Sequence, residues 1–146
     1  MRKQVLTFLL IFVTLLQAES LKNKDYGSVI VSEVTSIYDG DTFRVNIEGL
    51  HDLIGHRIGI CVNGIDTPEM RGRCQQEKEL ARKAKQYTVS ALRGAKKIEL
   101  RNMKRGKYFR IVADVYIDGK NLTDSLIKNK LGVPYDGGTK QKDWCK

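Results

Sequence analysis

The sequence lacks internal repeats and low-complexity linkers, and it has no long hydrophobic run after residues 5–16, a stretch of 12 residues broken only by two threonines. Without linkers, a chain of 146 residues has room for one domain with one core. Crossing a bilayer takes roughly 20 apolar residues, so this stretch is too short to span one comfortably. These absences point to a single small domain.

Acidic residues are also scarce, since 17 Asp and Glu face 26 Lys and Arg and leave a net charge of +9. The shares of hydrophobic residues, 41%, and charged residues, 29%, are ordinary for a globular protein and exclude a disordered one. A surplus of Lys and Arg attracts polyanions such as nucleic acid or anionic lipid. It equally serves as a solubilising surface charge, so charge alone does not select a partner.

The N-terminus has the layout of a targeting segment. Arg2 and Lys3 precede the apolar stretch, and Ala18 offers a small residue before a cleavage point. We therefore expect residues 1–18 to be a signal peptide, which makes the protein exported, either periplasmic or secreted. Leu16 is larger than the residue usually found three positions before the cut, so an uncleaved membrane anchor is the alternative.

The sequence has only three cysteines, and an odd number leaves one of them without an intramolecular partner. An oxidising compartment favours disulfides. Cys61 lies within an apolar strand pattern, whereas Cys74 and Cys145 lie in polar, loop-like sequence. We predict a Cys74–Cys145 disulfide, which closes a loop of about 70 residues and contributes roughly 4 kcal/mol in the chain-entropy model.

Hydrophobic periodicity predicts five strands and two helices. Alternation indicates strands over residues 27–38, 42–48, 58–62, 97–103 and 108–117. Helical spacing indicates residues 75–92, with Leu80, Ala84, Tyr87, Ala91 and Leu92 on the apolar face, and residues 121–131. This order suits an α+β, mostly β fold, a five-stranded OB-fold barrel with two to three packed helices within residues 27–146; a generic α+β sandwich is the alternative.

Three carboxylates fall at predicted strand ends. A barrel brings Asp41 and Asp66 to one rim, where two aspartates suit a hard cation such as Ca²⁺, although Mg²⁺ and Mn²⁺ also accept them. Glu69 is placed to orient or deprotonate a water, and Arg110 to neutralise phosphate charge. Taken singly, each has a plainer interpretation as a turn, a helix start or a solvated charge.

In combination these residues resemble the staphylococcal nuclease-like (thermonuclease) family over residues 27–136. The resemblance rests on three motifs in order, Ile37-Tyr38-Asp39-Gly40-Asp41-Thr42, Gly64-Ile65-Asp66-Thr67-Pro68-Glu69 and Lys107-Tyr108-x-Arg110 followed by Asp118-Gly119. It implies an OB barrel whose substrates are DNA and RNA. We separately expect a monomer without stable membrane contact once the signal peptide is removed.

The resemblance also implies a role for each matching residue. Ca²⁺ is bound by the carboxylates of Asp41 and Asp66 and by the carbonyl of Thr67. Glu69 assists attack by water on a phosphodiester, and Arg110 stabilises charge on the phosphate. The nucleotide pocket is lined by Lys107, Tyr108 and Tyr135, although both tyrosines equally suit core or surface positions.

The match to the family fails at two places. A second catalytic arginine, expected five residues before Asp66, is replaced by Cys61, and the family's long C-terminal helix is not expected after Tyr135. A thiol lacks the fixed charge and the donors of a guanidinium, and loss of one such donor commonly costs about 10²–10³ in rate. The sequence therefore leaves two hypotheses: a calcium-dependent nuclease of reduced rate, or a nucleic-acid-binding module without efficient cleavage.

Overall fold

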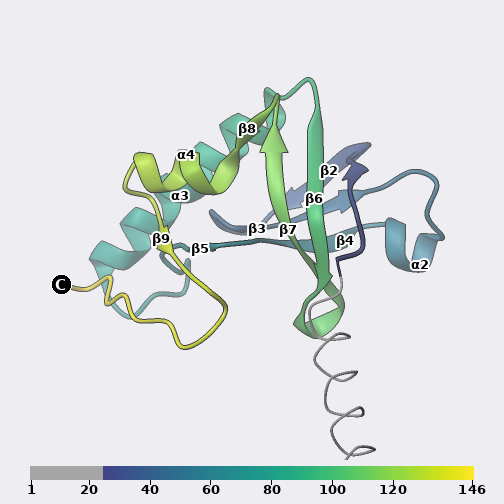
Figure 1. The fold of residues 1–146 in the computed structure, drawn as a ribbon. Coiled ribbons are helices and arrows are strands. Elements are labelled where there is room, and N and C mark those ends of the chain that lie inside the picture. Colours follow the sequence, from purple (N-terminus) through teal and green to yellow (C-terminus); the bar gives the residue numbers. More distant parts are fainter. Residues whose placement is uncertain (1–24) are drawn as a thin grey trace, which may run out of the picture.

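The computed structural model describes residues 25–146 and contains a curled mixed sheet with helices packed around it (Figure 1). The predicted signal peptide, residues 1–18, lies outside the described residues. The seven-stranded sheet runs in the order β1-β6-β7-β4-β3-β2, with β8 beside β7. Its strands are β1 (Val29–Ile30), β2 (Glu33–Ile37), β3 (Thr42–Asn46), β4 (Ile58–Val62), β6 (Ile98–Arg105), β7 (Arg110–Ile117) and β8 (Lys120–Asn121).

The two outermost strands of this sheet are successive pieces of one extended segment. The Val31 N–H donates to the Ile98 carbonyl at 2.9 Å, and the next N–H, of Ser32, donates to the Asn46 carbonyl at 3.0 Å. The chain thus changes partner from β6 to β3 between two residues, which is why the single strand predicted over residues 27–38 is observed as two. This continuity joins the sheet edges and confirms the predicted OB-type α+β fold.

Alternation along the strands separates the core from the cleft side of the sheet. On β3, Phe43 and Val45 are buried while Arg44 is exposed. On β4, Ile58 and Ile60 point inward, and Cys61 is half-buried on the other face. Because side chains alternate with a period of two, the same strands supply both the core and one wall of the cleft described below.

Within residues 25–146, three α-helices accompany the sheet: α2 (Asp52–Gly55), α3 (Gln75–Arg93) and α4 (Leu122–Lys128). Helix α2 was not among the helices predicted from the sequence, and the His51 side chain caps it by accepting the Leu53 N–H at 3.1 Å. The predicted helix over residues 121–131 is shorter than expected, since Asn129 caps its C-terminus. None of the helices in residues 25–146 is long and apolar enough to cross a membrane.

The buried stripe of α3 differs from the predicted one. Its buried residues are Glu77, Ala81, Ala84, Thr88 and Leu92, whereas Leu80, Tyr87 and Ala91 are only half-buried. The stripe is rotated toward small residues because the helix approaches the turn that follows β2 closely. A buried carboxylate and a buried hydroxyl therefore face the rest of the protein from this helix.

A second, two-stranded sheet ties the C-terminal segment to the barrel. It pairs β5 (Ile65–Asp66) with β9 (Val133–Pro134), with Asp66 opposite Val133. The chain then curves past β5 and ends near the start of α3 (Figure 1), where Cys145 forms the predicted disulfide with Cys74. Cys61 is free, also as predicted.

Candidate active site

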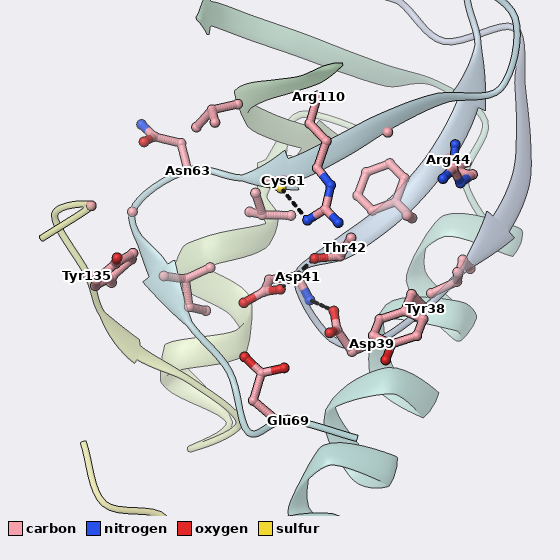
Figure 2. A pocket seen from close by; sticks show the side chains of 18 of the residues that line it. Tyr38, Asp39, Asp41, Thr42, Arg44, Cys61, Asn63, Glu69, Arg110 and Tyr135 are labelled. Atoms are coloured by element: carbon pink, nitrogen blue, oxygen red, sulfur yellow. Dashed lines mark hydrogen bonds between the residues drawn. The ribbon is translucent and has the colours of Figure 1, made fainter. Parts of the chain in front are cut away.

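A cleft of about 750 Å³ opens where the turn after β2, the end of β4, the start of β7 and the C-terminal segment meet (Figure 2). Four of the predicted site residues line it: Asp41, Glu69, Arg110 and Tyr135. Its charged and polar lining includes Asp39, Asp41, Thr42, Arg44, Cys61, Asn63, Glu69, Arg110, Tyr135, Asp136 and Lys140.

The Asp39-Gly40-Asp41 turn is held against α3 by close packing. A Cβ atom at Gly40 would lie 2.9 Å from the Ala84 Cβ and 3.1 Å from the Thr67 Cγ2, so only glycine fits there without a shift. The buried Thr88 hydroxyl donates to the Gly40 carbonyl at 2.7 Å. The helix therefore determines where Asp41 enters the cleft.

A hydrogen bond from Thr67 joins Asp41 to the segment that carries Asp66. The Thr67 N–H donates to Asp41 Oδ2 at 3.2 Å, and the Thr42 hydroxyl donates to Asp41 Oδ1 at 3.0 Å. Asp66 and Thr67 are both buried. Asp41 lines the cleft, whereas the buried Asp66 and Thr67 lie directly behind it, outside the cleft lining.

Asp39 is a further carboxylate of this region that the sequence suggested only as part of a turn. It is 4% exposed, and its Oδ1 accepts the Asp41 N–H at 3.2 Å. Burial, together with the negative charges of Asp41 and Glu69, raises the pKa of Asp39 to about 7. Asp39 therefore binds a proton more readily than an exposed aspartate does.

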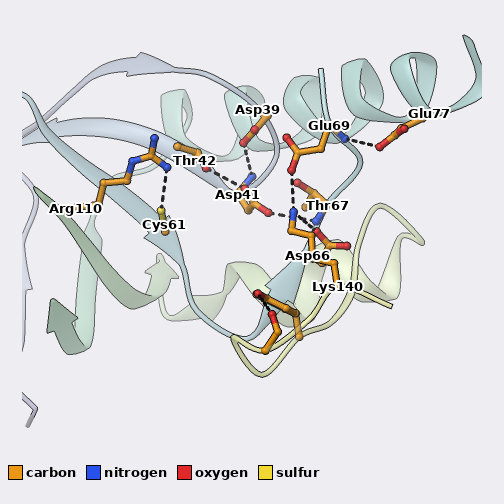
Figure 3. Close-up of polar contacts among 12 residues, drawn as sticks. Asp39, Asp41, Thr42, Cys61, Asp66, Thr67, Glu69, Glu77, Arg110 and Lys140 are labelled. Atoms are coloured by element: carbon orange, nitrogen blue, oxygen red, sulfur yellow. Dashed lines mark hydrogen bonds and ion pairs between the residues drawn. The ribbon is translucent and has the colours of Figure 1, made fainter. Parts of the chain in front are cut away.

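Glu69 lies at the mouth of the cleft on a segment that Glu77 organises. The Glu69 side chain is about half exposed, at 51%. The buried Glu77 carboxylate accepts the Arg73 N–H at 2.9 Å. It also accepts the Glu69 N–H at 3.4 Å (Figure 3). Sequence reasoning missed Glu77; the available signal was an acidic residue at a core-facing position of the predicted helix.

Lys140 from the C-terminal segment bridges two of the predicted site residues (Figure 3). Its Nζ lies 2.6 Å from Asp66 Oδ1 and 2.7 Å from Glu69 Oε1. Partial burial alone would lower the pKa of Lys140, but the Asp66 and Glu69 carboxylates outweigh it and raise the pKa. Nothing in the sequence near Lys140 signalled this contact, because it joins residues 71 positions apart.

Arg110 reaches the cleft across a glycine on the neighbouring strand. It lies opposite Gly59 in the parallel β4–β7 pair, where a Cβ would lie 3.1 Å from the Arg110 Cγ. The Arg110 Nη1 is 3.7 Å from the Cys61 Sγ, so the residue that replaces the expected second arginine is in direct contact with the first. Arg110 therefore lies on the cleft wall.

Two other arginines lie near this wall. Arg44, paired with Gly59 across β3–β4, lines the cleft on the same face as Cys61, and its Nη1 donates to the Arg57 carbonyl at 3.0 Å. Among the described residues that line the cleft, Arg57 is absent. Of the two, Arg44 is the one placed to add a positive charge near Arg110.

The predicted nucleotide-pocket residues are separated in the structure. Tyr135 lines the cleft, with its hydroxyl donating to the Gly138 carbonyl at 2.6 Å. Lys107 and Tyr108 lie on η1 (Lys107–Phe109), a 3₁₀ turn between β6 and β7, outside the described cleft lining. Tyr108 is 87% exposed, and its ring lies 5.8 Å from the Arg110 Cζ.

The donor set on this rim suits a divalent cation. The carboxylates of Asp41 and Asp66 offer the hard oxygen ligands that Ca²⁺ and Mg²⁺ prefer. Together with Glu69 they do not form a close three-carboxylate cluster within residues 25–146. One contact shows that the rim attracts positive charge: the ammonium of Lys140 lies between Asp66 and Glu69. The residues present therefore fit a metal ion.

Comparison with known proteins gives a family match and two similar relatives. Residues 59–143 match the family model described as staphylococcal nuclease homologue. The chain is 32% identical over 115 residues to the SPbeta prophage-derived endonuclease YokF of Bacillus subtilis (strain 168), over 74% of this chain and 36% of that protein. It is 31% identical over 112 residues to Endonuclease YncB of the same strain, over 72% of this chain and 49% of that protein. The chain thus spans between about a third and half of the length of these relatives.

Proposed function

This chain belongs to the family of staphylococcal nuclease homologues, and from that premise we propose that it is a calcium-dependent nuclease that hydrolyses phosphodiester bonds of DNA and RNA. One observation carries the proposal. Asp41, Glu69 and Arg110 line one cleft, and Thr67, the residue after Asp66, donates its N–H to Asp41 Oδ2. The endonuclease names of both similar relatives support the same reaction class.

Glu69 and Arg110 each have a role in the proposed reaction that follows from their position in the cleft. Glu69 is exposed enough to meet a water in the cleft and to take its proton as the water attacks phosphorus. Arg110 faces the same space with a permanent charge and paired donors for phosphate oxygens.

Asp41 and Asp66, with the Thr67 carbonyl, are the residues that would bind the metal. Members of the family are generally metal-dependent. When bound, a divalent cation supplies positive charge to the phosphate without proton or redox chemistry. The choice of calcium is part of the proposal, because the same oxygen ligands also suit Mg²⁺ and Mn²⁺.

The charge of the chain and its disulfide support the substrate and the location. A net charge of +9 favours encounter with a polyanion, and the basic residues Lys104, Arg105 and Lys107 lie near the turn that leads to Arg110. A Cys74–Cys145 disulfide suits an oxidising compartment, so we also propose export from the cell through the N-terminal signal peptide.

Cleavage of single-stranded DNA and of RNA by the purified protein, with Ca²⁺ and with a chelator, tests this function. We expect cleavage that needs the metal, and we expect Glu69→Gln to lower the rate by at least about 10² while nucleic-acid binding persists, because the amide cannot accept the proton. Undiminished cleavage by Glu69→Gln would place the catalytic base elsewhere. Binding without cleavage would instead support the second candidate, a nucleic-acid-binding module, which the replacement of an expected arginine by Cys61 favours.

A further inference from the structure

The C-terminal segment carries a positive charge into the centre of the carboxylate cluster. Lys140 is the residue concerned, with its ammonium 2.6 Å from Asp66 and 2.7 Å from Glu69. Asp66 is 4% exposed at its side chain and Glu69 is 51% exposed, so the ammonium joins a buried carboxylate to one at the cleft mouth. A lysine held by two carboxylates at hydrogen-bond distance is a component of the site.

The segment that carries Lys140 is anchored on both sides. Before it, β9 pairs with β5 so that Val133 lies opposite Asp66, and the Tyr135 N–H donates to the Gly64 carbonyl at 3.1 Å. After it, the buried Trp144 and the Cys74–Cys145 disulfide attach the chain to the start of α3. Lys140 is therefore delivered to Asp66 by a closed loop of chain.

The turn between these anchors is also internally bonded. The Tyr135 hydroxyl donates to the Gly138 carbonyl at 2.6 Å, and the Gly138 N–H donates to Asp136 Oδ1 at 2.9 Å. Such local bonds limit the conformations available to residues 135–138 and hence the reach of the lysine that follows. Because the fold already orders this segment, formation of the two ion pairs loses less conformational entropy than it would in a flexible chain.

The ammonium uses a carboxylate that the metal also needs. Lys140 lies on Asp66 Oδ1, and Asp66 is one of the two aspartates proposed above to bind the divalent cation. Two positive charges that share a buried carboxylate repel each other strongly, because the buried surroundings screen charge less than water does. Binding of the divalent cation therefore opposes the Lys140–Asp66 contact.

We propose that Lys140 is a resident cation of this site: it neutralises Asp66 and Glu69 when no metal is bound and competes with the divalent metal for Asp66. The inference rests on the proposed function, since that function places the metal on Asp66. It assigns to the C-terminal segment control over the metal concentration at which the enzyme works. It also makes Lys140 a positioning residue for Glu69.

The test is direct calorimetric titration of Ca²⁺ into the wild-type protein and into Lys140→Met, with Lys142→Met as the matched control. Lys142 lies two residues away on the same segment, contacts the Trp144 ring at 5.5 Å, and forms no ion pair within residues 25–146. Both variants lose one positive charge, so they differ in the contact with Asp66 and Glu69. We expect Lys140→Met to bind Ca²⁺ at least roughly tenfold more tightly, and Lys142→Met to stay within about twofold of wild type.

The outcomes separate failure of the inference from failure of the proposed function. Metal-dependent cleavage with equal affinity in wild type and Lys140→Met would overturn the inference alone, and so would weaker binding by Lys140→Met. An equal gain in Lys142→Met would assign the effect to overall charge and overturn the inference as well. Absence of Ca²⁺, Mg²⁺ and Mn²⁺ binding in all three proteins would overturn the metal-dependent function together with it. A lower Ca²⁺ concentration for half-maximal cleavage by Lys140→Met would support both.

Discussion

At the scale of single residues, the contact between Arg110 and Cys61 is the feature that bears most directly on rate. Arg110 is the only arginine of the predicted catalytic pair that the sequence retains, and its Nη1 lies 3.7 Å from the thiol that replaces the other. Cys61 is half-buried on the cleft wall, so a longer side chain at this position extends into the cleft. An arginine at position 61 would place a second guanidinium beside Arg110, whereas the thiol of Cys61 supplies no charged donor.

We expect Cys61→Arg to raise the rate of DNA cleavage by about 10²–10³, because one more charged donor stabilises the phosphate in the transition state. Single-turnover cleavage at saturating Ca²⁺ measures the effect. Cys61→Ser is the control, since it removes the thiol without adding charge and should leave the rate within a fewfold of wild type. A Cys61→Arg protein that folds, binds DNA and cleaves no faster would show that Arg44 or another cation already meets this need.

At the scale of secondary-structure elements, α3 is the support on which the acidic turn rests. Gly40 lies against Ala84, and Thr88 donates its hydroxyl to the Gly40 carbonyl. The first turn of the same helix supplies Glu77, which accepts the N–H groups of Arg73 and Glu69. One helix thus positions both Asp41 and Glu69, although it contributes no residue to the lining of the cleft in the described part of the chain.

Thr88→Val should reduce the free energy of unfolding by about 1–3 kcal/mol, because it keeps the shape of the side chain and leaves the buried Gly40 carbonyl without its donor. The looser turn should also weaken Ca²⁺ binding through Asp41. Denaturant unfolding and Ca²⁺ titration measure the two effects. Thr88→Ser retains the hydroxyl and should bind Ca²⁺ nearly as wild type does; an equal loss of affinity in both variants would attribute the effect to packing.

At the scale of the whole molecule, a small barrel is stabilised by a link between its middle and its C-terminus. The Cys74–Cys145 disulfide joins residues 71 positions apart, and Cys74 also caps α3 by accepting the Glu77 N–H at 3.4 Å. The same link closes the loop that carries Lys140. The same disulfide therefore contributes both to the stability of the barrel and to the position of Lys140.

Replacing Cys74 and Cys145 together by serine should lower the free energy of unfolding by about 4 kcal/mol, the loop-closure entropy expected for a ring of this length. Thermal unfolding of the double variant beside the wild-type protein, with and without reductant, measures this. Reductant should lower the melting temperature of the wild type and leave that of the double variant unchanged, because Cys61 has no partner to lose. Equal melting temperatures for the two proteins would contradict the prediction.

The sequence by itself determined the features that depend on local pattern. Alternation along β3 and β4 revealed which side chains face the core, and helical spacing revealed α3 to within one residue at its C-terminal end. The motifs around Asp41 and Asp66 identified the carboxylates at strand ends, and polar surroundings identified the cysteine pair. These succeed because side-chain direction repeats every two residues in a strand and every 3.6 in a helix.

Only the tertiary structure decided which residues far apart in the chain meet. The split of residues 27–38 into β1 and β2 follows from a change of partner strand, which no local pattern encodes. The burial of Asp39 and the place of Glu77 depend on how closely α3 approaches the turn. Lys140 reaches Asp66 because β9 and the disulfide anchor its segment on both sides, so its role arises from the path of the chain in space.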